Sequence, residues 1–169
     1  MRVWYANLRH LTPKVQVLQI AAQKKKNIPQ IFMFVETFLS SSDPDPPSPI
    51  DGYVMVRQDR KTKYKKGGGG LAIYHHPDML LTREVQLCTS SDTVEIMTVK
   101  IKQRDNNARN VILVYISPEE KLVTGLLQVG EIVEKLEDPN VLLLGDFNPK
   151  QHEAAVLHQF CSTYMRYPK

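Results

Sequence analysis

Short apolar runs and longer amphipathic stretches alternate along the chain, and the spacing of their hydrophobic positions separates strands from helices. Runs rich in β-branched and aromatic residues predict strands at residues 2–8, 30–37, 53–60, 70–76, 82–88, 94–103, 111–117 and 140–148. The runs at 30–37 and 140–148 are almost uniformly apolar. We therefore predict that both lie in the centre of a sheet, where neither face meets water.

Helical spacing of apolar positions predicts helices at residues 11–26, 117–138 and 152–165. Thr12 is a suitable N-cap for the first helix, with Pro13 at its first position. The second helix is predicted to open with a capping box, in which Ser117 is the N-cap and Glu120 the third residue. Helices interleaved with strands, several of which are joined as hairpins, predict an α/β fold of layers with mixed sheets.

The composition is typical of a folded domain. The chain has 169 residues, of which 42% are hydrophobic and 24% charged, enough for one domain with a real core. The longest apolar stretch, residues 28–39, is too short to cross a bilayer and contains Glu36. Cys88 and Cys161 make no disulfide framework, so we expect an intracellular protein without a membrane partner. The net charge of +4 slightly favours an anionic partner such as nucleic acid.

Polar side chains stand at or beside the ends of the apolar strands, namely Asn7, Glu36, Tyr115, Asp146 and Asn148. Layered α/β proteins build sites at strand ends, because the sheet fixes the backbone while the side chain still reaches solvent. A carboxylate buried in the strand that contains Glu36 is costly unless it is paired or bound to a cation. Mg²⁺ accepts one or two carboxylates, an amide and water as ligands. The ordinary alternatives are a turn asparagine, a salt-bridged glutamate and a packed tyrosine.

A basic run begins at the last residue of the strand predicted at 53–60 and comprises Arg60, Lys61, Lys63, Lys65 and Lys66. Such a run is most often the solvated tip of a hairpin. Its functional interpretation is contact with phosphates, which positions nucleic acid without reading its sequence. The glycines at 67–70 predict a close-packed or flexible turn, because no helix with a phosphate-binding lysine follows them.

Five segments, taken in order, resemble the endonuclease/exonuclease/phosphatase superfamily, and in particular the apurinic-endonuclease-like domain of non-LTR retrotransposons. They are "NLRHLTPK", "PQIFMFVETFL", "GY…RQDR…GGGGLAIY", "LVYISP" and "LLLGDFN". The resemblance implies a layered α-β-β-α sandwich with mixed sheets. It also implies a DNA-nicking endonuclease that depends on Mg²⁺, with Mn²⁺ as the second candidate, and that acts in the nucleus beside a reverse transcriptase downstream in a longer parent protein.

The same resemblance implies a role for each polar residue at the strand ends. Glu36 corresponds to the metal-binding glutamate, and Asn7 to the asparagine beside it. Tyr115 corresponds to the tyrosine that touches the scissile phosphate. Asp146 matches the aspartate that orients or deprotonates the attacking water, and Asn148 the asparagine that hydrogen-bonds the phosphate.

The chain departs from the family pattern after residue 148. Members of the family continue through strands that carry a further aspartate and a Ser-Asp-His motif, so we expect residues 1–169 to form a single, incomplete, C-terminally truncated domain. Two alternatives stay open on the sequence alone. One is a catalytically inactive remnant that acts as a nucleic-acid-binding module, and the other is the same fold acting on phosphomonoesters or phospholipids.

Overall fold

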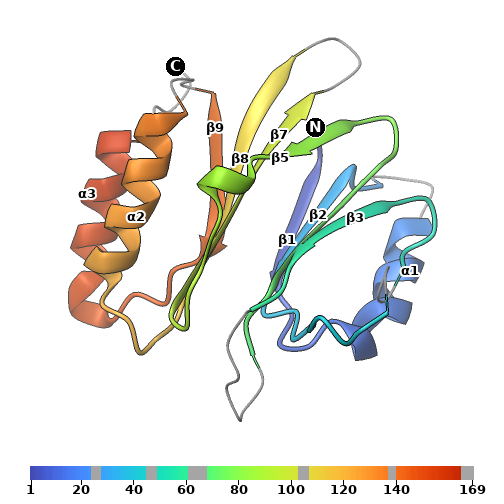
Figure 1. The fold of residues 1–169 in the computed structure, drawn as a ribbon, viewed down its shortest axis with the longest axis horizontal. Coiled ribbons are helices and arrows are strands. Elements are labelled where there is room, and N and C mark those ends of the chain that lie inside the picture. The colour runs from blue at the N-terminus through green and yellow to red at the C-terminus, as the bar shows by residue number, and fades with distance from the viewer. Residues whose placement is uncertain (24–27, 45–48, 61–67, 103–106, 137–139, 165–169) are drawn as a thin grey trace.

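The computed structural model describes residues 1–23, 28–44, 49–60, 68–102, 107–136 and 140–164. Two β-sheets pack face to face, with a helix on the outer face of one and a pair of helices on the outer face of the other (Figure 1). This is the predicted α-β-β-α sandwich with mixed sheets. In the part of the chain that is described, no helix is long and apolar enough to cross a membrane.

The first sheet is built from the N-terminal part of the chain, in the order β1-β2-β4-β3. Its strands are β1 (Val3–Asn7), β2 (Ile31–Val35), β3 (Val54–Gln58) and β4 (Leu71–His75). β1 and β2 are parallel and need a crossover, which includes the short 3-10 helix η1 (Thr12–Lys14) and α1 (Val15–Gln23). All five residues of β2 are buried, which confirms its predicted central place.

The second sheet follows in sequence and has the order β5-β7-β8-β9, with β6 paired to β7. Its strands are β5 (Leu80–Arg83), β6 (Thr89–Ser90), β7 (Val94–Lys102), β8 (Ala108–Ile116) and β9 (Val141–Asp146). β8 and β9 are parallel, and α2 (Leu122–Lys135) makes their crossover. η3 (Gln151–Glu153) and α3 (Ala154–Tyr164) follow β9, and α3 packs beside α2.

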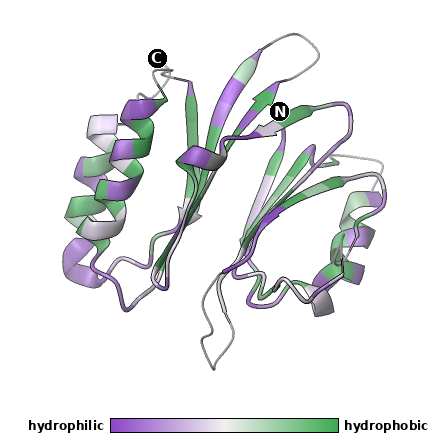
Figure 2. Ribbon diagram, viewed as in Figure 1, coloured by the Kyte–Doolittle hydropathy of each residue, from purple (hydrophilic) through white to green (hydrophobic). Residues whose placement is uncertain are grey.

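Three apolar clusters hold the layers together. One lies between the sheets and includes Met33 and Leu113, a second lies under α2 and α3 around Val129, and a third lies under α1 around Leu11. Figure 2 shows apolar residues along the strands of both sheets and polar residues along the connections at the lower end of the sandwich. The core therefore leaves one end of the sandwich free for polar chemistry.

Two helix starts differ from prediction. Thr12 is the first residue of η1, and the N-cap is Leu11, which makes no side-chain cap. The carboxylate of Glu120 accepts a hydrogen bond from the Thr93 hydroxyl at 2.6 Å, so it does not reach back to Ser117. Instead, the Glu120 N–H donates to the Ser117 carbonyl at 3.0 Å in a tight turn, and α2 begins at Leu122.

Two strand predictions are also wrong. Residues 82–88 are not one strand: β5 ends at Arg83 and a 3-10 turn, η2 (Val85–Leu87), follows. The Thr98 hydroxyl of β7 donates to the Leu87 carbonyl at 2.8 Å, which gives this turn a hydrogen bond outside any ladder. β9 is an edge strand rather than a central one in the described structure, since it pairs only with β8 and its residues are all partly exposed.

Candidate active site

The carboxyl ends of strands from both sheets meet at one end of the sandwich, the lower end in Figure 1. β1 and β2 run in parallel, so Asn7 lies beside Val35 and hence beside the following Glu36. β8 and β9 are also parallel, and Tyr115 lies opposite Asp146 in their register. Because β1 contacts β9 across the sandwich, the two sheets bring the predicted residues together.

Asn7 links the two sheets through its side chain. Its Nδ2 donates to Oδ2 of Asp146 at 2.7 Å, although the two residues are 139 positions apart in sequence. Its Oδ1 accepts the backbone N–H of Arg9 at 3.1 Å. These two bonds fix the amide plane, and the second lone pair of Oδ1 remains available to a ligand.

Asn148 holds the other oxygen of Asp146 and the end of β8. Its backbone N–H donates to Oδ1 of Asp146 at 3.3 Å, and its Nδ2 donates to the Ile116 carbonyl at 2.9 Å. Both oxygens of Asp146 therefore accept hydrogen bonds from the protein, and the residue is half-buried. The carboxylate is held in one orientation while part of it still reaches the surface.

Tyr115 and Glu36 form the second pair of the site, and Tyr115 is only 7% exposed. Burial raises the pKa of Tyr115 to about 12, and the charge of Glu36 and a hydrogen bond to that carboxylate act in the same direction. Arg60 acts against this rise. The hydroxyl therefore keeps its proton at neutral pH and is a hydrogen-bond donor beside the carboxylate.

The loops of the site have strained backbones. Within the described residues, the non-glycine residues with positive φ are Arg9 (45°), His10 (94°), Glu36 (53°), Phe38 (58°) and Asn148 (42°). The turn after β1 and the turn after β2 stabilise each other, because the His10 N–H donates to the Glu36 carbonyl at 2.9 Å. The rings of His10 and Phe38 also stack, with centroids 5.8 Å apart. Strain of this kind persists where surrounding structure enforces it, and it concentrates at functional sites.

Comparisons with known proteins rest on structure alone, since no protein-family model and no curated protein matches the chain in sequence. The endonuclease domain of TRAS1, a telomere-specific non-LTR retrotransposon, superposes with a TM-score of 0.70 over 96% of this chain and 71% of that chain, at 19% identity. The 3′ phosphatase NExo from Neisseria, bound to a product DNA hairpin, superposes with a TM-score of 0.59 over 88% of this chain and 58% of that chain, at 19% identity. The catalytic domain of Xenopus laevis APE2 gives a TM-score of 0.56 over 99% and 68%, at 12% identity.

The chain has the endonuclease/exonuclease/phosphatase fold. At identities of 19% and 12%, the comparisons show the fold, and the chemistry has to be argued from this chain's own residues. The predicted residues occupy the strand ends of that fold, on both sheets.

The donor set at the strand ends suits a hard cation with few protein ligands. No group of three or more His, Cys, Asp or Glu side chains that could hold a metal occurs in the described residues. Glu36 lies partly exposed at the end of β2, and Asn7, on the strand beside it, offers its Oδ1 as a second oxygen donor. One carboxylate and one amide oxygen, completed by water and phosphate, fit Mg²⁺ or Mn²⁺.

Arg60 does not lie where the basic run predicted it. Its side chain is only 13% exposed, and its guanidinium forms an ion pair with the fully buried carboxylate of Glu95 at 3.0 Å. The sequence shows Arg60 only as part of a cluster of cations, and its ion-pair partner Glu95 is 35 positions away. Lys61, Lys63, Lys65 and Lys66 fall outside the described residues, so their predicted contact with nucleic acid stays a prediction.

Sequence reasoning missed Tyr5 and Glu95. The Tyr5 hydroxyl is buried and has no hydrogen-bond partner in the described structure. Burial raises its pKa, and so do the negative charges of Asp146 and Glu36, which places the hydroxyl near both carboxylates. An aromatic residue inside an apolar strand gives no signal of this role. Glu95 could have been found, because it is a carboxylate inside an apolar strand, which is the same signal that marked Glu36.

Proposed function

We propose that the chain hydrolyses phosphodiester bonds in nucleic acid and nicks DNA as an endonuclease of the retrotransposon type. The observation that carries the proposal is the 2.7 Å hydrogen bond between Asn7 and Asp146, which joins the strand ends of the two sheets beside Glu36 and Tyr115. The TRAS1 domain that shares the fold is an endonuclease by name, and the Neisseria protein was seen with DNA. These likenesses support DNA as the substrate.

Asp146 is the group we assign to the attacking water. Its carboxylate is held from two sides, by Asn7 and by the Asn148 backbone, so it presents a fixed acceptor at the rim of the site. A carboxylate within hydrogen-bond reach of a water can orient that water and accept its proton during attack on phosphorus. Asn7 and Asn148 thus act on the water through Asp146.

Tyr115 and Asn148 are the donors we assign to the phosphate. The Tyr115 hydroxyl keeps its proton, because its pKa is raised to about 12, and it would turn this proton from Glu36 to the phosphate when the substrate binds. The Asn148 amide uses one N–H on Ile116 and retains a second. Donors fixed before the reaction stabilise the negative charge that develops on the phosphoryl oxygens. Removal of one such donor costs on the order of 3 kcal/mol of activation free energy.

Mg²⁺ is the cation we propose for this site, with Mn²⁺ as the alternative, and Glu36 and Asn7 are the residues that would hold it. When bound, the cation would supply Lewis-acid stabilisation of charge on the phosphate. A nuclear location and a reverse transcriptase downstream in a longer parent chain belong to the same proposal and rest on the sequence resemblance.

The test is nicking of supercoiled plasmid by the purified chain, with Mg²⁺ and with chelator. We expect nicking in Mg²⁺ that stops in chelator and falls by at least about 100-fold in Asp146→Asn, since the variant keeps the shape of the side chain but loses the proton acceptor. Asp92→Asn is the matched control: Asp92 is an exposed carboxylate between β6 and β7, and nicking should be unchanged.

Two results would contradict the proposal. A folded wild-type chain that binds DNA without nicking it would favour the catalytically inactive binding module. Release of phosphate from a small monoester or a phospholipid, with no cleavage of DNA, would keep the fold and the site but change the substrate class.

A further inference from the structure

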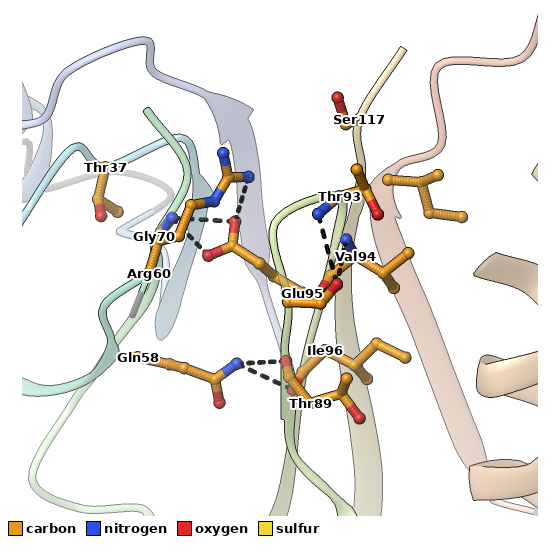
Figure 3. Close-up of polar contacts among 12 residues, drawn as sticks. Thr37, Gln58, Arg60, Gly70, Thr89, Thr93, Val94, Glu95, Ile96 and Ser117 are labelled. Carbon is orange, nitrogen blue, oxygen red and sulfur yellow. Dashed lines mark hydrogen bonds and ion pairs between the residues drawn. The ribbon is translucent and has the colours of Figure 1, made fainter. Parts of the chain in front are cut away.

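Glu95 is a carboxylate buried between the two sheets, and nothing in the proposed chemistry uses it directly. It lies in β7, is 0% exposed, and accepts hydrogen bonds from Arg60 Nη2 at 3.0 Å and from the Gly70 backbone N–H at 3.0 Å (Figure 3). Burial raises the pKa of the Glu95 carboxyl, while the charge of Arg60 and the Gly70 hydrogen bond act in the opposite direction. We call Glu95, Arg60, Gly69 and Gly70 the clasp.

The clasp is a costly way to join two sheets. Taking both charges out of water requires free energy that an apolar pair of the same size would not need. In addition, Nε of Arg60 is buried without a hydrogen-bond partner in the described structure, which adds to that cost. Stability alone does not explain why a charged pair occupies this place.

One arm of the clasp holds Tyr115. Glu95 and Tyr115 are direct partners in the antiparallel register of β7 and β8, so their side chains share one face of the sheet. The ion pair keeps the Arg60 guanidinium over the Tyr115 ring, with 5.4 Å between Cζ and the ring centroid. This is within the range of a cation–π contact, and it limits how the ring can tilt.

The other arm holds the strained turn that follows Glu36. The Gly70 N–H binds Glu95, while the Gly70 carbonyl accepts the Thr37 N–H at 3.1 Å and the Gly69 carbonyl accepts the Phe38 N–H at 2.9 Å. Both glycines have positive φ, of +72° and +87°. A Cβ at Gly69 would overlap the Arg60 guanidinium, and one at Gly70 would overlap the Thr37 hydroxyl.

We propose that Arg60 and Glu95 are positioning residues of the active site, and that the clasp sets the Tyr115 hydroxyl and the Glu36 carboxylate in their working geometry. This inference rests on the proposed phosphodiesterase function. The clasp reaches Tyr115 through the guanidinium and Glu36 through the glycine backbone. It thus couples the residue assigned to the phosphate with the residue assigned to the cation.

The experiment compares Arg60→Met, Arg60→Lys and Glu95→Gln with the matched control Arg83→Met. Arg83 is also a half-buried arginine that joins the sheets, through hydrogen bonds to the Arg57 carbonyl and the Gln58 side chain. Each variant is assayed for kcat and KM on a duplex oligonucleotide and for thermal stability. The position of Tyr115 is read from NMR of ring-labelled tyrosine, without metal or DNA, with the resonance assigned by Tyr115→Phe.

For Arg60→Met we expect kcat to fall by about 10- to 100-fold with KM little changed, because small misplacements of catalytic groups have effects of this size. The Tyr115 resonance should move. Glu95→Gln should act in the same direction, and Arg60→Lys should restore activity in part, since lysine keeps the charge but not the planar stack. Arg83→Met should lower thermal stability alone.

The proposal is overturned if Arg60→Met and Arg83→Met lose similar stability while kcat and the Tyr115 resonance stay at wild-type values. If Arg60→Met does not fold, the same comparison of kcat and of the Tyr115 resonance is made with Glu95→Gln. If the wild-type chain does not nick DNA, the proposed function fails separately. The NMR comparison still shows whether the clasp positions Tyr115, because a resonance that moves in neither clasp variant contradicts it.

Discussion

Within the described residues, Tyr5 carries a buried hydroxyl without a hydrogen-bond partner, on a strand that ends two residues later at Asn7. An unsatisfied buried hydroxyl lowers stability, and a protein tolerates it where the group has a use. The charges of Asp146 and Glu36 both act on this hydroxyl, so it lies near the proposed active site, and we expect it to donate to a phosphate oxygen of the substrate.

Tyr5→Phe should therefore stabilise the protein and slow the reaction. We expect the free energy of unfolding to rise by about 1 kcal/mol, because the substitution removes an unpaired polar group from the interior. The nicking rate should fall. Chemical denaturation and the plasmid assay measure the two effects, with Tyr53→Phe as control: the Tyr53 hydroxyl donates to the Pro29 carbonyl, so its loss should destabilise and leave nicking unchanged. Lower stability in Tyr5→Phe would contradict this assignment.

Ionisation of Tyr115 should make the free energy of unfolding depend on pH in the alkaline range. Its pKa is raised from 10.0 to about 12, so the folded state holds the proton more tightly than the unfolded state. The resulting stabilisation is complete below pH 10 and is lost as the pH rises towards 12. Allowing for solvent screening, it amounts to on the order of 1 kcal/mol.

The wild-type protein should lose more stability between pH 9 and pH 12 than Tyr115→Phe. Urea denaturation at a series of pH values measures this, and comparing the two proteins removes the contribution of the other buried tyrosines, Tyr5 and Tyr74, whose pKa values are also raised. Parallel pH profiles for the two proteins would mean that the Tyr115 hydroxyl titrates as it does in the unfolded chain.

At the scale of elements, two glycines of α2 face neighbouring elements, Gly125 towards β8 and Gly130 towards α3. A Cβ at Gly125 would overlap the Ile116 side chain, which belongs to the last residue of β8. A Cβ at Gly130 would lie 3.2 Å from the Tyr164 ring of α3, a side chain that can shift. The contact between Gly125 and Ile116 sets the distance between the helix and the sheet. The contact between Gly130 and Tyr164 leaves little space but sets no such distance.

Gly125→Ala should destabilise the protein by about 1–3 kcal/mol, despite the gain in helix propensity, because overpacking forces α2 away from β8. Gly130→Ala should be nearly neutral or slightly stabilising. Thermal denaturation of the two variants side by side is the measurement. Since Ile116 also accepts the Asn148 amide, Gly125→Ala should reduce nicking as well. Equal stability of the two variants would show that the helix can move without cost.

At the scale of the whole molecule, the apolar patterns predict the layers well, but they do not predict the position of every strand or the start of every helix. The uniformly apolar β2 is central as predicted, because a strand of this composition is stable only where both of its faces are buried. The equally apolar β9 lies at an edge, since the pattern describes what a strand buries and not how many neighbours it has. The capping residue Glu120 binds Thr93 instead, a long-range contact that no local motif contains.

The candidate site shows the same division between local and long-range information. Asn7, Glu36, Tyr115, Asp146 and Asn148 could be selected from the sequence because each polar group ends an apolar strand, and the structure brings these residues to one end of the sandwich. Arg60 could not be placed in this way. A run of cations predicts a solvated surface, and only the fold reveals that its first member faces the buried Glu95.

The two sheets are contiguous in sequence, and this order has a consequence for how the site comes into being. The strands of the first sheet all lie within residues 3–75, and those of the second within residues 80–146. Cleavage between them would leave two fragments, one carrying Asn7 and Glu36 and the other carrying Tyr115, Asp146 and Asn148. Each fragment holds an incomplete set of the proposed active-site groups. Activity should therefore appear only when the two fragments associate.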